Sequence, residues 1–203
     1  MTDYLKGKDA ALMIAGLSLA TFMQVLDSTI ANVALPAIAG HLGASVSQGI
    51  WVVTFFMVFN AASIPLTGFL SKRIGEVRLF LISVTLFIVA SLLCGLSTNL
   101  VMLIIARVFQ GLVSGPMIPL AQSLLLRNTP LERRSMAMGL FGIVIMIAPV
   151  LGPILGGYIS DNYYWGWIFF INVPIGLLSL DLCWIILKRH ETEKESVPVD
   201  YVG

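Results

Sequence analysis

Long apolar stretches alternate with short polar segments along the chain. Six stretches are long enough to cross a membrane as helices, at residues 11–35, 48–70, 79–98, 101–126, 136–159 and 166–187. A bilayer core of about 30 Å needs roughly 20 apolar helical residues. The strands of a membrane barrel would be about 10 residues long and of alternating polarity, which these stretches are not. The pattern therefore predicts an all-α membrane protein with six transmembrane helices.

The composition agrees with this prediction and excludes other classes. Of the 203 residues, 58% are hydrophobic and only 11% are charged, whereas an average soluble domain carries roughly 25% charged residues. Too little polar surface remains for a soluble enzyme or a disordered chain. The net charge of +1 gives no sign of nucleic-acid binding. Cys94 and Cys183 lie in apolar stretches and indicate neither a disulfide framework nor a metal site.

The basic residues predict an orientation. Apart from Arg107, every lysine and arginine lies before the first stretch, between the second and third, between the fourth and fifth, or after the sixth. Basic loops tend to stay in the cytoplasm. We therefore expect residues 1–10 to be a cytoplasmic N-terminus, 11–187 to be the bundle, and 188–203 to be a cytoplasmic linker. The last residues of that linker look like the start of a further span that is missing.

A weak internal repeat relates the first three stretches to the last three. A shift that lays Gly68-Phe69-Leu70-Ser71 on Gly157-Tyr158-Ile159-Ser160 also lays Leu93-Cys94 on Leu182-Cys183. Because three spans is an odd number, the two triplets run in opposite directions across the membrane. Inverted repeats of three plus three spans are typical of transporters.

Three ionisable residues lie inside the apolar stretches, namely Asp27, Arg107 and Asp181. Each such group costs on the order of 2.5–3.5 kcal/mol at mid-membrane on insertion scales, so it usually faces a wet cavity or a partner. Asp27 and Arg107 lie at similar depths in antiparallel spans. We predict that they face one cavity and pair directly or through water. A static ion pair that only holds spans 1 and 4 together is the alternative, and the role of Asp181 stays open.

Polar residues share a helical face with each member of this pair. Gln24, Ser28 and Asn32 lie on the face of Asp27, and Gln110 and Ser114 lie on the face of Arg107. These stripes predict the walls of a substrate cavity. Apolar Phe55, Met57, Phe59 and Met146 are further candidates for its lining. Hydrogen bonding between helices is the alternative for each uncharged member.

Four segments, at 26–36, 107–111, 142–157 and 165–176, resemble motifs of the major facilitator superfamily, specifically of its drug:proton antiporters with 14 spans, the EmrB/QacA group. The resemblance implies the N-terminal six-helix bundle of such a transporter, proton coupling through Arg107, and no cofactor beyond the proton gradient. It also implies an antiporter motif in span 5, made of Gly142, Pro149, Gly152, Pro153, Gly156 and Gly157. We interpret that motif as a kinked, tightly packed helix that seals one gate.

A fifth motif of the superfamily is altered in this chain. The loop between spans 2 and 3 matches at Gly68, Arg73 and Gly75, but the usual aspartate is Lys72 and a usual basic residue is Glu76. The two charge signs are exchanged. A latch built on the aspartate therefore does not carry over, and a reversed latch through Glu76 is a hypothesis.

Together these features predict proton-coupled efflux of lipophilic, often cationic, drugs across a bacterial inner membrane, with Asp27 and Arg107 as the coupling pair. We expect an N-terminal fragment to be inactive alone. Pumps of this group work with a periplasmic adaptor and an outer-membrane channel in double-membraned bacteria. Two alternatives stay open, a nutrient uniporter or symporter and a six-span interaction protein without transport. No HExxH motif, P-loop or catalytic Ser/His or paired-Asp constellation favours an enzyme.

Overall fold

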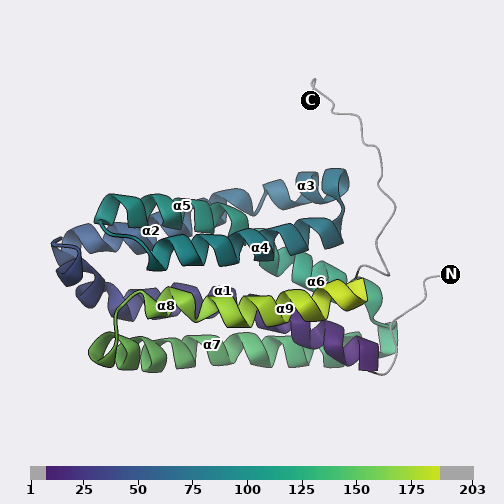
Figure 1. Ribbon diagram of the computed structural model, residues 1–203. Helices are drawn as coiled ribbons and strands as arrows, with labels where there is room; N and C mark the ends of the chain where they lie inside the picture. Colours follow the sequence, from purple (N-terminus) through teal and green to yellow (C-terminus); the bar gives the residue numbers. More distant parts are fainter. Residues whose placement is uncertain (1–7, 188–203) are drawn as a thin grey trace, which may run out of the picture.

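The computed structural model describes residues 8–187, which form helices lying side by side along one direction (Figure 1). The predicted linker 188–203 and most of the predicted N-terminal segment lie outside the described residues. In chain order the helices are α1 (Lys8–His41), α2 (Val46–Ser63), α3 (Leu66–Ile74), α4 (Glu76–Gly95), α5 (Leu100–Ser114), α6 (Met117–Asn128), the 3-10 helix η1 (Leu131–Arg133), α7 (Arg134–Asn162), α8 (Trp167–Phe170) and α9 (Asn172–Leu187).

Within residues 8–187, six segments are long and apolar enough to cross a membrane, and the predicted all-α fold with six spans is confirmed. The helix bounds differ from the predicted ones. α1 continues through Pro36 to His41, beyond the expected end at 35. α7 likewise runs unbroken through Pro149 and Pro153.

Three of the predicted spans are interrupted rather than continuous. The second divides into α2 and α3 at Pro65, the fourth into α5 and α6 at Pro116, and the sixth into α8 and α9 at Ile171. Proline has no backbone N–H to continue the hydrogen-bond ladder. The first two breaks lie against each other, since a Cβ added at Gly115 would stand 3.1 Å from the Cβ of Ser63.

The packing of the helices has the symmetry that the repeat predicts. α1 packs mainly against α7 and α9, while α5 packs mainly against α2 and α4. When the first three spans are laid on the last three, the α1–α7 contact corresponds to the α5–α2 contact. The α1–α9 contact corresponds in the same way to the α5–α4 contact. The first helix of each triplet therefore packs mainly against the second and third helices of the other triplet.

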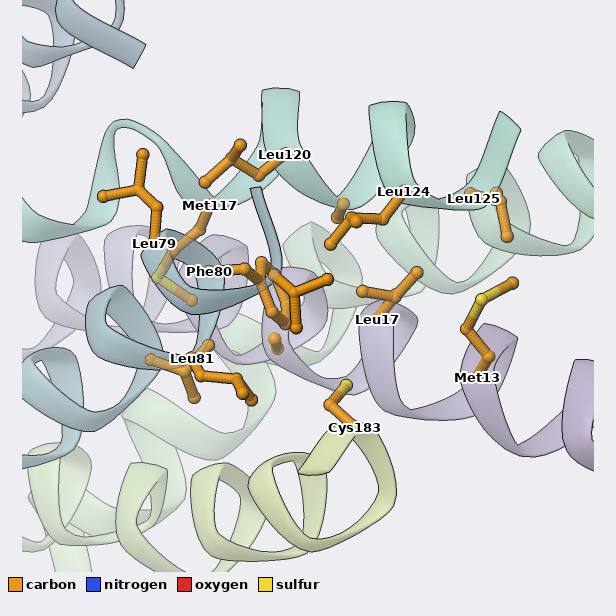
Figure 2. Close-up of a cluster of buried hydrophobic side chains, with 14 of the residues drawn as sticks. Met13, Leu17, Leu79, Phe80, Leu81, Met117, Leu120, Leu124, Leu125 and Cys183 are labelled. Carbon is orange, nitrogen blue, oxygen red and sulfur yellow. The ribbon is translucent and has the colours of Figure 1, made fainter. Parts of the chain in front are cut away.

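Two apolar clusters fill the interior. The larger lies toward the end where α1 begins and α9 ends, and Figure 2 shows Leu17 of α1, Phe80 of α4 and Leu124 of α6 within it. The smaller lies toward the other end and includes Ile30 of α1 and Trp165. Along α1, the buried Asp27 lies between Met23 of the larger cluster and Ile30 of the smaller one.

Glycines allow α7 to approach α1 closely. A Cβ added at Gly152 would come 2.7 Å from the Cβ of Thr29, and one at Gly156 would come 3.0 Å from the carbonyl oxygen of Ile30. Small residues permit such contacts between membrane helices. Gly142 and Gly157 of the same helix have open space at the equivalent position, so the glycines of α7 divide into two faces.

This division predicts opposite effects for two matched substitutions. Gly152→Ala should lower the free energy of unfolding by about 1–3 kcal/mol, because the methyl group overpacks the contact with α1. The methyl group added by Gly142→Ala would have no neighbour within 4 Å. This substitution should raise the free energy of unfolding by about 0.5–1 kcal/mol, since alanine is the better helix former. Unfolding of the detergent-purified variants measures both. Equal shifts for the two would contradict the packing described.

Candidate functional site

A buried ion pair lies at the middle of the bundle. Asp27 of α1 and Arg107 of α5 are both 0% exposed, and Nη1 of Arg107 lies 2.5 Å from Oδ2 of Asp27. Charges removed from water are expensive unless they are paired and their remaining hydrogen-bonding atoms are satisfied. The surroundings of each partner therefore decide whether the arrangement is stable.

The carboxylate of Asp27 accepts three hydrogen bonds. Besides Arg107, the amide nitrogens of Asn172 and Gln110 donate to its Oδ1 at 2.7 and 3.2 Å. Asn172 is the first residue of α9, while Gln110 lies one turn from Arg107 on α5. Donors from two other helices thus surround a carboxylate carried by α1.

The guanidinium of Arg107 is enclosed by polar and aromatic groups. Its Nε donates to the carbonyl oxygen of Val52 on α2 at 3.3 Å, and Nη1 also donates to Oε1 of Gln110 at 2.7 Å. Its central carbon lies 4.1 Å from the ring centroid of Phe56 and 5.5 Å from that of Phe169. Such cation–π contacts gain strength where water is absent. Nη2 has no hydrogen-bond partner among the described residues.

A second layer of polar groups comes from α4. Oγ of Ser91 accepts from the amide nitrogens of Gln110 and Asn172 at 2.8 and 3.2 Å, and the thiol of Cys94 donates to Oε1 of Gln110 at 3.5 Å. Ser91 and Cys94 are three residues apart and share one helical face, as do Arg107 and Gln110. The site therefore joins side chains or backbone of α1, α2, α4, α5, α8 and α9.

The structure brings the predicted coupling pair into direct contact and encloses it, so that neither side chain opens to a cavity. The predicted cavity residues divide into two groups. Gln110 lies in the buried network, and Ser114 is buried where it accepts from Nδ2 of Asn60 at 2.7 Å. On α1, Gln24 is buried and Ser28 half-buried, whereas Asn32 is exposed.

The antiporter motif divides in a similar way. Gly152 and Gly156 face α1, while Pro149 and Pro153 are exposed. Gly142 and Gly157 have open space around them, so only two of the six motif residues take part in the seam between α1 and α7. The rest belongs to the outer face of α7.

The altered loop motif forms the junction of α3 and α4. Gly75 has a φ of 96°, a conformation that favours glycine, and so permits the sharp turn there. Lys72 and Arg73 are exposed, and Gly68 has open space around it. Glu76 accepts a hydrogen bond from Oγ of Ser123 at 3.0 Å and lies 3.6 Å from Nη1 of Arg127. Glu76 thus links α4 to α6.

Sequence reasoning missed three side chains that form hydrogen bonds in the site. Ser91 and Cys94 lie in an apolar run with no charge beside them, so nothing in the sequence separates them from ordinary packing residues. Asn172 appears in the sequence only as part of a motif. Its amide is the single strongly polar group in the first half of the sixth span, and that isolation is the signal that could have found it.

The surface of the bundle carries apolar features outside this site. A groove of about 630 Å³ lies between the first half of α1 and the first half of α7, lined largely by alanine, leucine, isoleucine and methionine side chains. On α2, the rings of Trp51, Phe55 and Phe59 follow one another at centroid distances of 5.5 and 6.3 Å. Both features offer apolar contact area on the outside of the helices.

Comparison with known proteins agrees with the geometry. Residues 17–199 match the family described as Major Facilitator Superfamily. The chain is 61% identical to the multidrug export protein EmrB of Haemophilus influenzae, over 98% of this chain and 39% of that protein. It is 55% identical to the fatty acid resistance protein FarB of Neisseria gonorrhoeae, over 99% of this chain and 40% of that protein. The chain thus spans about two fifths of the length of these curated relatives.

A solved structure gives independent evidence for the fold. The crystal structure of the peptide transporter POT (E310Q mutant) in complex with sulfate superimposes with a TM-score of 0.78, covering 93% of this chain and 40% of that one. The sequence identity is only 15%, so this likeness shows the fold alone. The resemblance to drug antiporters inferred from the motifs is confirmed by the more similar relatives.

The buried pair predicts a non-additive pattern of stability. Arg107→Met leaves the Asp27 carboxylate buried without a counter-charge, and should lower the free energy of unfolding by about 3–5 kcal/mol. Adding Asp27→Asn removes the uncompensated charge and should restore much of that loss. A double-mutant cycle measured by unfolding in detergent tests this.

The partly exposed pair of Arg127 and Glu76 supplies the control. Arg127→Met should change the free energy of unfolding by at most about 1 kcal/mol, because partly exposed ion pairs contribute little. Additive effects of Arg107→Met and Asp27→Asn would show that the buried pair does not act as a unit.

Proposed function

The chain belongs to the major facilitator superfamily, and from this membership we propose that its helices form the N-terminal six-helix bundle of a proton-coupled multidrug exporter. The observation that carries the proposal is the enclosed pair of Asp27 and Arg107. An ionisable residue inside a membrane helix is a marker of ion or proton pathways. The name multidrug export protein, which the relative EmrB carries, supports the same function.

Asp27 is the proton carrier in this proposal. When its carboxylate takes up a proton, the attraction to Arg107 disappears, and the guanidinium is left buried beside only neutral acceptors. A buried charge without its partner is destabilising by several kcal/mol. The bundle then favours a different arrangement of α1 and α5, in which Arg107 reaches water or another anion. Proton uptake and conformational change are linked through this one contact.

The substrates we propose are lipophilic and often cationic. The ring stripe of Trp51, Phe55 and Phe59 offers apolar area and negative ring faces to a cation. Met57 and Met146 are exposed and suit varied shapes. Polar contacts would come from Gln24, Ser28 and Asn32 of α1, whereas Gln110 and Ser114 act from inside the bundle.

We further propose that the end of the bundle holding the basic residues faces the cytoplasm of a bacterial inner membrane. Lys72, Arg73, Arg127 and Arg133 lie around the end where α3 and α6 finish and α7 begins (Figure 1), and the positive-inside rule favours the cytoplasm for such a cluster. Both termini of the chain would then be cytoplasmic. A periplasmic adaptor and an outer-membrane channel are the partners expected of a pump of this group.

Two motifs have structural roles in this proposal. The seam of Gly152 and Gly156 against α1 keeps one gate closed, because close helix contact leaves no path for water. The contact of Glu76 with Ser123 and Arg127 acts as the reversed latch between α4 and α6.

A chimaera tests the coupling role. This chain replaces the matching residues of the EmrB protein of Haemophilus influenzae, with which it shares 61% identity, and drug efflux driven by a pH gradient is measured in proteoliposomes. Asp27→Asn should abolish gradient-driven efflux, because an amide cannot exchange a proton. The effect expected is a loss of at least about tenfold in rate.

The matched control is Asp161→Asn, which changes an exposed carboxylate near the end of α7 and should leave efflux intact. Normal gradient-driven efflux in the Asp27→Asn chimaera would overturn the coupling role. Release of protons on addition of drug would indicate antiport. A nutrient symporter would instead take up substrate and proton together.

A further inference from the structure

We propose that Asn172 is a positioning residue that sets the pH at which Asp27 exchanges its proton, by donating to the charged carboxylate and accepting from the neutral one. The inference rests on the proposed function of Asp27 as the proton carrier. Asn172 begins α9, directly after the interruption at Ile171 that divides the sixth span. From this position its side-chain amide reaches Asp27 of α1.

The hydrogen bonds of Asn172 support the first half of the proposal. Its Nδ2 donates to Oδ1 of Asp27 at 2.7 Å, which is shorter than the 3.2 Å bond from Gln110 to the same oxygen. The side chain of Asn172 is 0% exposed, so no solvent competes for this donor. A buried donor aimed at a carboxylate stabilises the charged form.

The other atom of the same amide supports the second half. Oδ1 of Asn172 is buried and has no hydrogen-bond partner among the described residues. Oε1 of Gln110, by contrast, already accepts from Arg107 and Cys94. When Asp27 is protonated, rotation of the Asn172 amide offers this free oxygen to the new O–H group. An amide serves both protonation states because it carries a donor and an acceptor.

Few other charged or titratable groups face Asp27. Arg107 comes from α5 and the Cys94 thiol from α4. α2 and α8 contain no ionisable side chain. The ionisable residues of α7 are not fully buried; they are Arg134, Tyr158 and Asp161. On α9, Asp181 is exposed, and Cys183 packs in the larger apolar cluster against Gly16. Asn172 and Gln110 are the neutral groups that contact Asp27, and of these two only Asn172 has an unpaired acceptor oxygen.

The test follows the protonation of Asp27 directly by infrared titration of the carboxyl C=O band in the full chain, with Asp27→Asn as the blank. Asn172→Leu removes donor and acceptor together. Because a hydrogen bond to a charged group is stronger than one to a neutral group, the titration midpoint should move to higher pH by about 1 unit. An unchanged midpoint would overturn the inference.

Ser179→Ala is the matched control on the same helix. Oγ of Ser179 donates to the carbonyl oxygen of Gly16 on α1 at 2.8 Å and is also buried, so its loss weakens the α9–α1 contact away from Asp27. The midpoint should stay where it is in the parent protein. An equal shift in Ser179→Ala would mean that Asn172 acts only through helix packing, and the inference would fail.

Two smaller substitutions keep the test decisive if Asn172→Leu does not fold. Asn172→Ser retains a hydroxyl that donates and accepts, whereas Asn172→Ala retains neither. The midpoint of Asn172→Ala should lie above that of Asn172→Ser, and equal midpoints would refute the inference. Failure of the proposed function gives a different result, since the parent protein would then show no titrating band that Asp27→Asn removes.

Discussion

A carboxylate placed among apolar helices has to be paired, and the whole interior is arranged around that requirement. Asp27 receives hydrogen bonds from α5 and α9, and its partner Arg107 is held by a carbonyl of α2 and a glutamine that α4 supports. Two apolar clusters cover this layer from either side. Because water is excluded, each of these hydrogen bonds carries more energy than it would at a surface.

In the proposed function, the same requirement explains why protonation of Asp27 has a large effect on the bundle. Protonation of Asp27 removes its negative charge but leaves the apolar clusters as they are. The buried Arg107 then has no counter-charge. The interruptions at Pro65, Pro116 and Ile171 divide the helices near this region into shorter rigid segments.

The fold was predictable from the sequence to a large extent, because lipid leaves few choices for a polypeptide backbone. The length of each apolar stretch was enough to predict six helices, and equal depth in antiparallel spans was enough to predict the contact of Asp27 with Arg107. Helix rotation was harder to predict. Gln110 and Asn32 both lie on polar stripes, yet the first is buried and the second exposed. Periodicity gives the angle between side chains but not the direction of the neighbouring helix, and Ser91 carries no pattern at all.

The layer of polar side chains also has a consequence for how the chain reaches its native arrangement. Apolar helices in lipid gain little from any one alignment over another, because lipid tails are as apolar as their side chains. Sliding α1 by one turn would carry Asp27 away from Arg107, Gln110 and Asn172. The polar layer therefore selects the register of the helices, as a buried asparagine does in a coiled coil. The groups proposed to move protons are thus also the ones that specify how the membrane helices assemble.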